Sequence, residues 1–321
     1  MCGIYGIAKS PKPYTKKQSR IAKKVLRDIA IDSETRGSHS SGIASIGETC
    51  TIYKSLLPSA KFVDSKEYNT ATKSLDKGSN ILLGHTRFAT EGAIVVNNAH
   101  PFQVGSTIGA HNGCVYNIDE MQTQLDKQCP VDSQLIFKSI DATDNIQEAV
   151  KDFDSDFALS YVKDNPNILH LCRENNRPLS VAYVPQLKTL FYASESDFLI
   201  DALRKQCIKV DVVKLNKNTL YSYNVGLFGD TKSNVQKTDF EYESRVYNNS
   251  INYYGSRFNN WTNQVEYEYD NYDYVSDEIP EYDDEYTLSP DWLSKQQNEL
   301  SRIYEGTRPS EWNYDMTEHQ W

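Results

Sequence analysis

Hydrophobic positions along the first two thirds of the chain follow two different spacings. Between residues 15 and 33, Ile21, Val25 and Ile29 recur every four positions, which places them on one face of a helix. Short apolar runs elsewhere predict strands, since strands are built from segments of about four to eight residues. These runs span residues 4–8, 43–46, 51–57, 81–88, 107–110, 157–162, 168–171, 179–183, 189–193, 210–213 and 219–223.

The order of these segments indicates the fold class. Two more helices are predicted, one at 134–140 with Asp132 as its cap and one at about 196–206. The strands come in runs and not in strict alternation with helices, which favours α+β layers over a doubly wound parallel sheet. We therefore expect two antiparallel sheets with flanking helices over roughly the first 225 residues.

The pattern changes beyond about residue 230. Gly and aliphatic residues become sparse, Tyr, Asn, Asp and Glu accumulate, and residues 266–274 and 281–286 contain no basic residue. A segment with so few aliphatic residues cannot bury a normal core. We expect a domain at 2–228 and an acidic Tyr/Asn-rich extension at 229–321 that is largely disordered, with a short amphipathic helix at 291–304. Its many aromatic residues also allow docking on the domain or on a partner.

Composition excludes several classes of protein. The 321 residues carry a formal net charge of −10, which argues against a nucleic-acid partner. No apolar run approaches the roughly 20 residues of a membrane span, and polar and basic residues follow the first short apolar run, unlike a signal peptide. Six scattered cysteines without a CxxC motif indicate reduced thiols in a cytoplasmic protein.

The first candidate for chemistry lies in the N-terminal segment Met1-Cys2-Gly3-Ile4. If Met1 is removed, Cys2 carries both a thiol nucleophile and a free α-amine. That amine has an ordinary pKa of about 8 and can take the thiol proton, directly or through a water. The alternative is a buried strand in which Cys2 packs as a small hydrophobic residue.

Five further residues each admit a functional and a structural interpretation. The side-chain amide of Asn112 and the backbone N–H of Gly113 can form an oxyanion hole, or the two residues can form a hairpin turn. Arg87 can clamp a carboxylate or form a surface ion pair. Thr90 can bind the same carboxylate or be a plain loop residue, and Asp132 can receive an α-ammonium group, cap a helix, or do both. Together with a thiol, these groups describe a pocket for free glutamine.

Three histidines complete the set of candidate residues. His85, His100 and His111 have no carboxylate or cysteine at the spacing of metal ligands. We therefore expect structural roles for them and no metal site.

An ordered series of motifs resembles the class II glutamine amidotransferases, whose glutaminase domain is an N-terminal-nucleophile hydrolase. The closest likeness is to the glutaminase domain of glucosamine-6-phosphate synthase. The motifs are Met1-Cys2-Gly3-Ile4, Arg36-Gly37, Ser40-Ser41-Gly42, Gly84-His85-Thr86-Arg87-Phe88-Ala89-Thr90, Asn98-Ala99-His100-Pro101-Phe102, His111-Asn112-Gly113, Asp132-Ser133, Arg173, Arg177-Pro178-Leu179 and Ala193-Ser194-Glu195. They cover roughly residues 2–225 in the order expected for the family.

The resemblance implies a four-layer αββα sandwich and a glutaminase mechanism. Cys2 would attack the side-chain amide of glutamine to give a γ-glutamyl thioester and ammonia, and water would then release glutamate. Asn112 and Gly113 would form the oxyanion hole, and the pocket residues Arg87, Thr90 and Asp132 would hold the substrate. Arg87 and Thr90 would bind its α-carboxylate and Asp132 its α-amine. No metal or organic cofactor is implied for this half-reaction.

The chain departs from the family pattern at three positions. His39 stands where Asp is usual, Phe88 where Trp is common and Glu91 where His is frequent. We expect His39 to loosen local hydrogen bonding, Phe88 to alter the lid over glutamine, and Glu91 to weaken glutamine binding or change the substrate.

The residues after 225 match none of the acceptor domains of the family, which are a sugar isomerase, a phosphoribosyltransferase and an ATP-dependent synthetase. They also contain no Gly-rich phosphate-binding loop. The leading hypothesis is a glutamine-hydrolysing enzyme that delivers ammonia to a separate synthetase or transferase subunit. Two alternatives stay open. One is a stand-alone amidohydrolase acting on another γ-glutamyl compound, and the other is a non-catalytic binding or regulatory protein on the same scaffold.

Overall fold

The computed structural model describes residues 2–90, 92–125, 129–229 and 235–244. Its helices are α1 (Lys16–Asp32), α2 (Ser59–Phe62), α3 (Lys66–Lys73), α4 (Ile118–Gln124), α5 (Asp132–Ala142), α6 (Ile146–Val150) and α7 (Ser196–Lys205). Its strands are β1 (Gly3–Lys9), β2 (Ser40–Ile46), β3 (Cys50–Ser55), β4 (Ile81–Arg87), β5 (Phe102–Val104), β6 (Thr107–Val115), β7 (Ser155–Val162), β8 (Ile168–Arg173), β9 (Ser180–Val184), β10 (Thr189–Ala193), β11 (Val212–Lys214), β12 (Thr219–Asn224) and β13 (Val235–Asp239). None of the described helices combines the length and apolar character needed to cross a bilayer.

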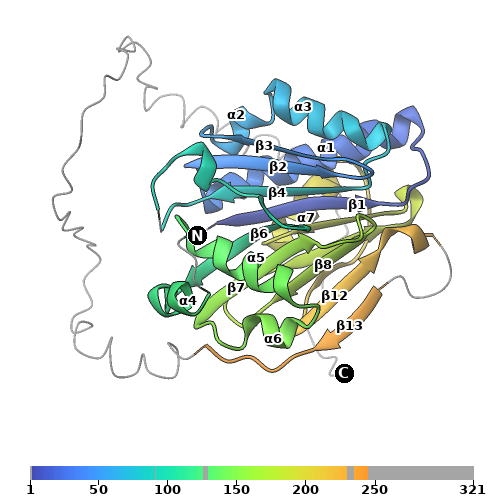
Figure 1. Ribbon diagram of the computed structural model, residues 1–321. Coiled ribbons are helices and arrows are strands. Elements are labelled where there is room, and N and C mark those ends of the chain that lie inside the picture. The colour runs from blue at the N-terminus through green and yellow to red at the C-terminus, as the bar shows by residue number, and fades with distance from the viewer. Residues whose placement is uncertain (1, 91, 126–128, 230–234, 245–321) are drawn as a thin grey trace, which may run out of the picture. The chain divides into compact units, whose positions relative to one another are not determined.

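The strands form two antiparallel sheets. The seven-stranded sheet has the order β11-β9-β10-β1-β4-β2-β3, and the six-stranded sheet has the order β13-β12-β8-β7-β6-β5. In Figure 1, α1, α2 and α3 lie against the outer side of the first sheet, while α5 and α6 cover the second. The predicted α+β class and four-layer αββα order are therefore confirmed.

Alternating side chains explain why the two sheets stack in layers. On β1, Tyr5 packs toward α1, whereas its neighbour Ile4 packs toward the other sheet. On β7, Ala158 packs between the sheets and Phe157 packs against α5. Because successive side chains of a strand point to opposite faces, β1 and β7 each supply two of the three cores.

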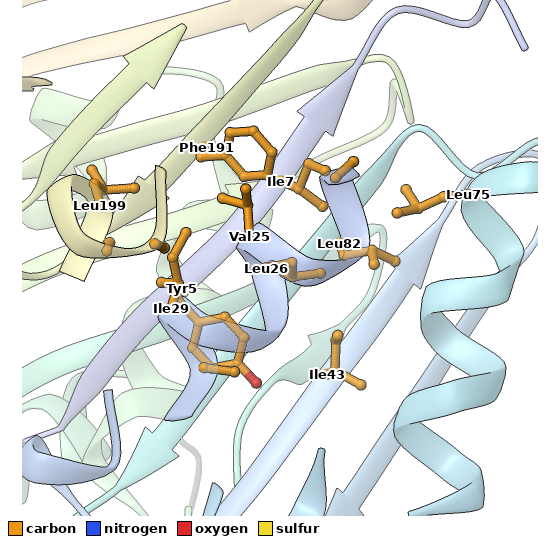
Figure 2. Close-up of a cluster of buried hydrophobic side chains, with 14 of the residues drawn as sticks. Tyr5, Ile7, Val25, Leu26, Ile29, Ile43, Leu75, Leu82, Phe191 and Leu199 are labelled. Atoms are coloured by element: carbon orange, nitrogen blue, oxygen red, sulfur yellow. The ribbon is translucent and has the colours of Figure 1, made fainter. Parts of the chain in front are cut away.

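The longest core-facing helix, α1, follows the predicted pattern. Thr15 caps it in a capping box, with its hydroxyl 3.3 Å from the Gln18 N–H. Val25 and Ile29 are fully buried, as the four-residue spacing predicts. Figure 2 shows them beside Tyr5 in the cluster between α1 and the seven-stranded sheet.

Two predicted boundaries around the candidate site differ from the structure. The strand predicted to end at residue 110 continues as β6 to Val115, so Asn112 and Gly113 lie inside a strand and the hairpin-turn alternative is wrong. Helix α5 begins at Asp132 with Val131 as its N-cap, so Asp132 lies in the first turn and is not the cap. Its carboxylate instead accepts the Val115 N–H at 3.0 Å.

The described chain also continues in the sheet beyond the predicted boundary at residue 228. Strand β13 pairs with β12, and Phe240 and Tyr242 pack in the core between the six-stranded sheet and its helices. The predicted domain of 2–228 is therefore extended by residues 235–244. The disorder predicted for the rest of 229–321 and the helix predicted at 291–304 lie outside the described residues.

Candidate active site

The thiol of Cys2 lies at the end of β4. Strand β1 pairs with β4 in a register that sets Gly3 opposite Thr86. Cys2, the residue before Gly3, therefore lies beside the end of β4. Cys2 Sγ lies 3.3 Å from the Phe88 N–H nitrogen and 3.4 Å from the Phe88 carbonyl oxygen. Burial raises the pKa of the Cys2 thiol, while the Phe88 N–H and the charge of Arg87 oppose that shift. A thiol held in this way needs a base to become a nucleophile.

An ion pair from two other segments anchors the Cys2 backbone. Arg36 Nε donates to the Cys2 carbonyl at 2.8 Å, and the same guanidinium is paired with Glu195. The Ser194 hydroxyl accepts the Ile4 N–H at 2.9 Å. The segment before α7 and the turn after α1 therefore fix the position of the N-terminal strand.

The loop after β4 is packed against residues 37–39. A Cβ atom at Gly37 would lie 2.5 Å from the Phe88 backbone nitrogen, so only glycine fits this close approach. His39 Nδ1 accepts the Ala89 N–H at 2.9 Å, and its ring stacks on Phe88 with centroids 4.8 Å apart. His39 thus supplies a hydrogen bond where we predicted a loss. The departure at Glu91 lies outside the described residues.

Arg87 is buried at the end of β4, where it is 3% exposed. Its guanidinium donates to the carbonyl oxygens of Ala93 at 3.1 Å and Gly92 at 3.3 Å. Burial lowers the pKa of Arg87, and the charges of Cys2 and Asp132 oppose the shift. The structure therefore brings the thiol, the guanidinium and the Asp132 carboxylate within electrostatic reach of one another. Thr90 is exposed, and its hydroxyl lies 3.6 Å from Cys114 Sγ.

Asn112 combines full burial with an unsatisfied amide. Its side chain is 0% exposed, and neither its Oδ1 nor its Nδ2 has a hydrogen-bond partner among the described residues. Because buried polar groups in proteins are nearly always hydrogen-bonded, such an amide suits a group that a substrate completes. A side chain at the neighbouring Gly113 would collide with the Asp156 carbonyl, so this position requires glycine.

Two carboxylates hold the backbone of β6 next to this amide. Asp156 Oδ1 accepts the Cys114 N–H at 2.8 Å, and its other oxygen is paired with Arg177. Asp132 Oδ2 accepts the following N–H, that of Val115. Sequence reasoning missed Asp156, because a carboxylate at the start of a predicted strand carries no sign of a partner more than 20 residues away.

The three histidines connect the sheets. His85 Nε2 donates to the His111 carbonyl at 3.0 Å and thereby joins β4 to β6, and the His85 and His100 ring centroids are 4.1 Å apart. Burial lowers the pKa of His85 to about 3 and that of His100 well below its usual value, so both are neutral at pH 7. In the part of the chain that the structure describes, no group of three or more His, Cys, Asp or Glu side chains could hold a metal ion.

Comparison with known proteins identifies the family of this site. A model of the glutamine amidotransferase domain matches residues 85–201. A glutamine–fructose-6-phosphate aminotransferase from Gluconobacter oxydans is 30% identical over 219 residues, which are 64% of this chain and 33% of that enzyme. The chain carries a class II glutamine amidotransferase domain. An amidophosphoribosyltransferase from Methanocaldococcus jannaschii is also 30% identical, over 165 residues that are 47% of this chain and 32% of that enzyme.

Solved structures share the fold of this amidotransferase domain. The glutamine phosphoribosylpyrophosphate amidotransferase of B. subtilis superposes with a TM-score of 0.55 at 18% identity, covering 76% of this chain and 50% of that one. A second structure, an allosteric regulatory enzyme of purine biosynthesis, gives a TM-score of 0.56 at 19% identity and covers 75% of this chain and 50% of its own. The predicted family is confirmed, and the chain spans about a third of the length of the two curated relatives named above.

Proposed function

We propose that the amidotransferase domain hydrolyses glutamine to glutamate and ammonia through a γ-glutamyl thioester on Cys2. The observation that carries this proposal is the amide of Asn112, which is fully buried and has no partner among the described residues. It lies in the strand that also supplies the Gly113 N–H. Two such donors can stabilise the negative oxygen that forms when a thiol attacks an amide carbonyl.

The reaction uses the terminus of the chain as its base. With Met1 removed, the Cys2 α-amine takes the thiol proton as Sγ bonds to the amide carbon of glutamine, and Asn112 and Gly113 donate to the resulting oxyanion. The amine then returns the proton to the leaving nitrogen, the C–N bond breaks and ammonia departs. Water attacks the thioester next, the carbonyl carbon gains a hydroxyl, and glutamate leaves as the sulfur regains a proton.

The α-carboxylate and α-ammonium groups of the substrate would be held by side chains of opposite charge. The Arg87 guanidinium and the Thr90 hydroxyl would bind the α-carboxylate, and the Asp132 carboxylate would bind the α-ammonium. Burial of Arg87 and Asp132 supports these roles, because charge pairs are stronger where water is excluded. Glutamine also appears in the name of the Gluconobacter relative, a glutamine–fructose-6-phosphate aminotransferase.

Ammonia would pass to an acceptor in a separate synthetase or transferase subunit. The relatives that share this domain are an aminotransferase and an amidophosphoribosyltransferase by name, which supports a transferase as the acceptor. Six free cysteines among the described residues fit the proposed cytoplasmic location.

Intact-mass spectrometry of the full chain before and after treatment with 6-diazo-5-oxo-norleucine tests the proposal. We expect a protein lacking Met1 that takes up a single adduct and hydrolyses glutamine. Cys2→Ala should neither label nor hydrolyse, whereas Cys114→Ala should still label, because its thiol is not the nucleophile. Equal labelling of Cys2→Ala and the unchanged protein would contradict the mechanism. Hydrolysis of another γ-glutamyl compound without hydrolysis of glutamine would point to the stand-alone amidohydrolase.

A further inference from the structure

A concave feature lies between α1 and α3, and none of the candidate active-site residues lines it. It is a groove of about 650 Å³, a size typical of small-molecule sites. Six cationic side chains and one carboxylate line it, namely Lys16, Arg20, Lys23, Lys24, Arg27, Lys73 and Asp76. The chain has a formal net charge of −10, so this positive charge is a local concentration against an acidic background.

Two of the cations already have partners. Lys23 pairs with Asp76 at 2.5 Å, and Arg27 pairs with Asp64 at 2.9 Å. Four exposed cations of the groove, Lys16, Arg20, Lys24 and Lys73, form no ion pair with any described residue.

The four cations face the groove from both walls. Lys16, Arg20 and Lys24 follow one another at four-residue spacing and therefore share one face of α1. Lys73 reaches the groove from the end of α3. Figure 1 shows both helices on the same side of the seven-stranded sheet.

The charge order of α1 is opposite to the one that stabilises a helix. Its first turn has no acidic residue, its last turn has no basic residue, and its carboxylates Asp28 and Asp32 lie in the second half. Cations near a helix N-terminus oppose the helix dipole, and like charges four residues apart repel. A bound anion would offset both effects. Because the arrangement disfavours the helix itself, anion binding explains it better than folding does.

We propose that the groove binds a small molecule that carries a chain of two or more phosphate groups. Arg20 can hold phosphate oxygens through two parallel N–H donors, and the three lysines supply ammonium donors around it. Convergence of the cations on two facing walls favours a compact anion over a nucleic-acid strand, which would need positive charge along an extended surface. The recognised group is the phosphate chain, and it can come from an inorganic polyphosphate or a nucleoside polyphosphate.

Calorimetric titration of the full chain with inorganic tripolyphosphate and with ADP tests the proposal. We expect tripolyphosphate to bind at physiological salt, and the double variant R20A/K24A to weaken binding by at least about tenfold, because two charge-assisted contacts are lost. The matched control is K17A/K66A. This control removes two exposed cations as well, Lys17 from α1 and Lys66 from α3, but neither of them lines the groove. The control should leave the affinity unchanged.

Binding of tripolyphosphate alone would identify an inorganic chain as the ligand, and tighter binding of ADP would identify a nucleotide. Equal losses in the two double variants would overturn the proposal, because only general electrostatic attraction would remain. Absence of binding by both anions, or binding only by a long RNA, would also overturn it. Thermal unfolding checks that the variants fold. The anion-free R20A/K24A variant should melt no lower than the unchanged protein, since it loses like-charge repulsion.

Discussion

At the scale of single residues, the oxyanion role proposed for Asn112 opposes what folding alone would favour at this position. Leaving a buried amide without a partner destabilises a fold by about 1–3 kcal/mol. Both polar atoms of Asn112 are in this state within the described residues. An apolar residue of similar volume would be better for folding, which is the physical basis of the oxyanion role proposed for this amide.

Asn112→Leu should therefore separate activity from stability. We expect kcat for glutamine hydrolysis to fall by about 10²–10³, the usual effect of losing one oxyanion donor. The melting temperature should stay the same or rise, because an unsatisfied polar group is removed. Steady-state kinetics and thermal unfolding measure the two effects on the same preparation.

Asn117 provides the control, since both ends of its amide are hydrogen-bonded. Its Oδ1 accepts the Asp154 N–H at 2.8 Å and its Nδ2 donates to the Asp152 carbonyl at 3.0 Å. Asn117→Leu should lower the melting temperature. If Asn112→Leu behaves in the same way and kcat is unchanged, Asn112 has a structural role and the oxyanion assignment fails.

The sequence alone could predict candidate residues for the site, but not the contacts that support them. Arg87, Asn112 and Asp132 carry residue types suited to one substrate, so their combination was informative. Asp156 was missed because its supporting role depends on an ion pair with Arg177. Arg177 lies 21 positions away and reaches Asp156 only after β7 and β8 have paired. Contacts of this kind leave no local pattern along the chain.

At the scale of elements, buried polar residues explain the errors in strand length. The apolar pattern of β6 stops at Ala110, although His111 and Asn112 are as buried as the residues before them. A polar pair after an apolar run indicates a turn when burial is unknown, so the strand was predicted five residues too short. Helix α3 was missed for a related reason, since Lys66–Lys73 has few apolar positions from which a period can be read.

The histidines between β4 and β6 should make the domain sensitive to acid. The folded-state pKa of His85 is about 3, whereas the unfolded chain has the ordinary value of about 6.5. Between these values the unfolded state binds the extra proton, so stability is complete above about pH 6.5 and is lost as the pH falls. The expected slope is up to about 1.4 kcal/mol per pH unit for each such histidine.

Urea unfolding at pH 7.5, 6 and 5 measures this slope. His85→Gln should reduce it, because glutamine keeps an N–H donor for the His111 carbonyl without a titrating group. A free energy of unfolding that does not change from pH 7.5 to 5 would mean that the histidines are not held neutral, and the inter-sheet link would need another explanation.

At the scale of the whole molecule, the end of the domain was the hardest boundary to predict. Strand β13 is mostly polar because it lies at the edge of its sheet, and Phe240 and Tyr242 stand among acidic residues that look like the following extension. The structure nevertheless buries both aromatic rings. The Tyr242 hydroxyl accepts the Ser155 N–H at 2.8 Å, next to the Asp156 that supports β6.

Two truncations test where the domain ends. A chain ending at residue 244 keeps β13, Phe240 and Tyr242, so we expect it to match the melting temperature and glutaminase activity of the full chain. A chain ending at residue 229 uncovers one side of the core under α5 and α6. Its melting temperature should be much lower, because removing even one buried aromatic side chain destabilises a protein by about 3–5 kcal/mol.

Tyr242→Phe in the 244-residue chain isolates one part of this effect. It removes only the hydroxyl, so it should reduce stability by about 1 kcal/mol while the ring stays packed on Phe157. Equal stability of the two truncated chains would return the boundary to residue 228. Aggregation of the 244-residue chain would mean that residues 245–321 contribute to the folded core, and their acidic composition would then have to be explained by packing instead of by solvation.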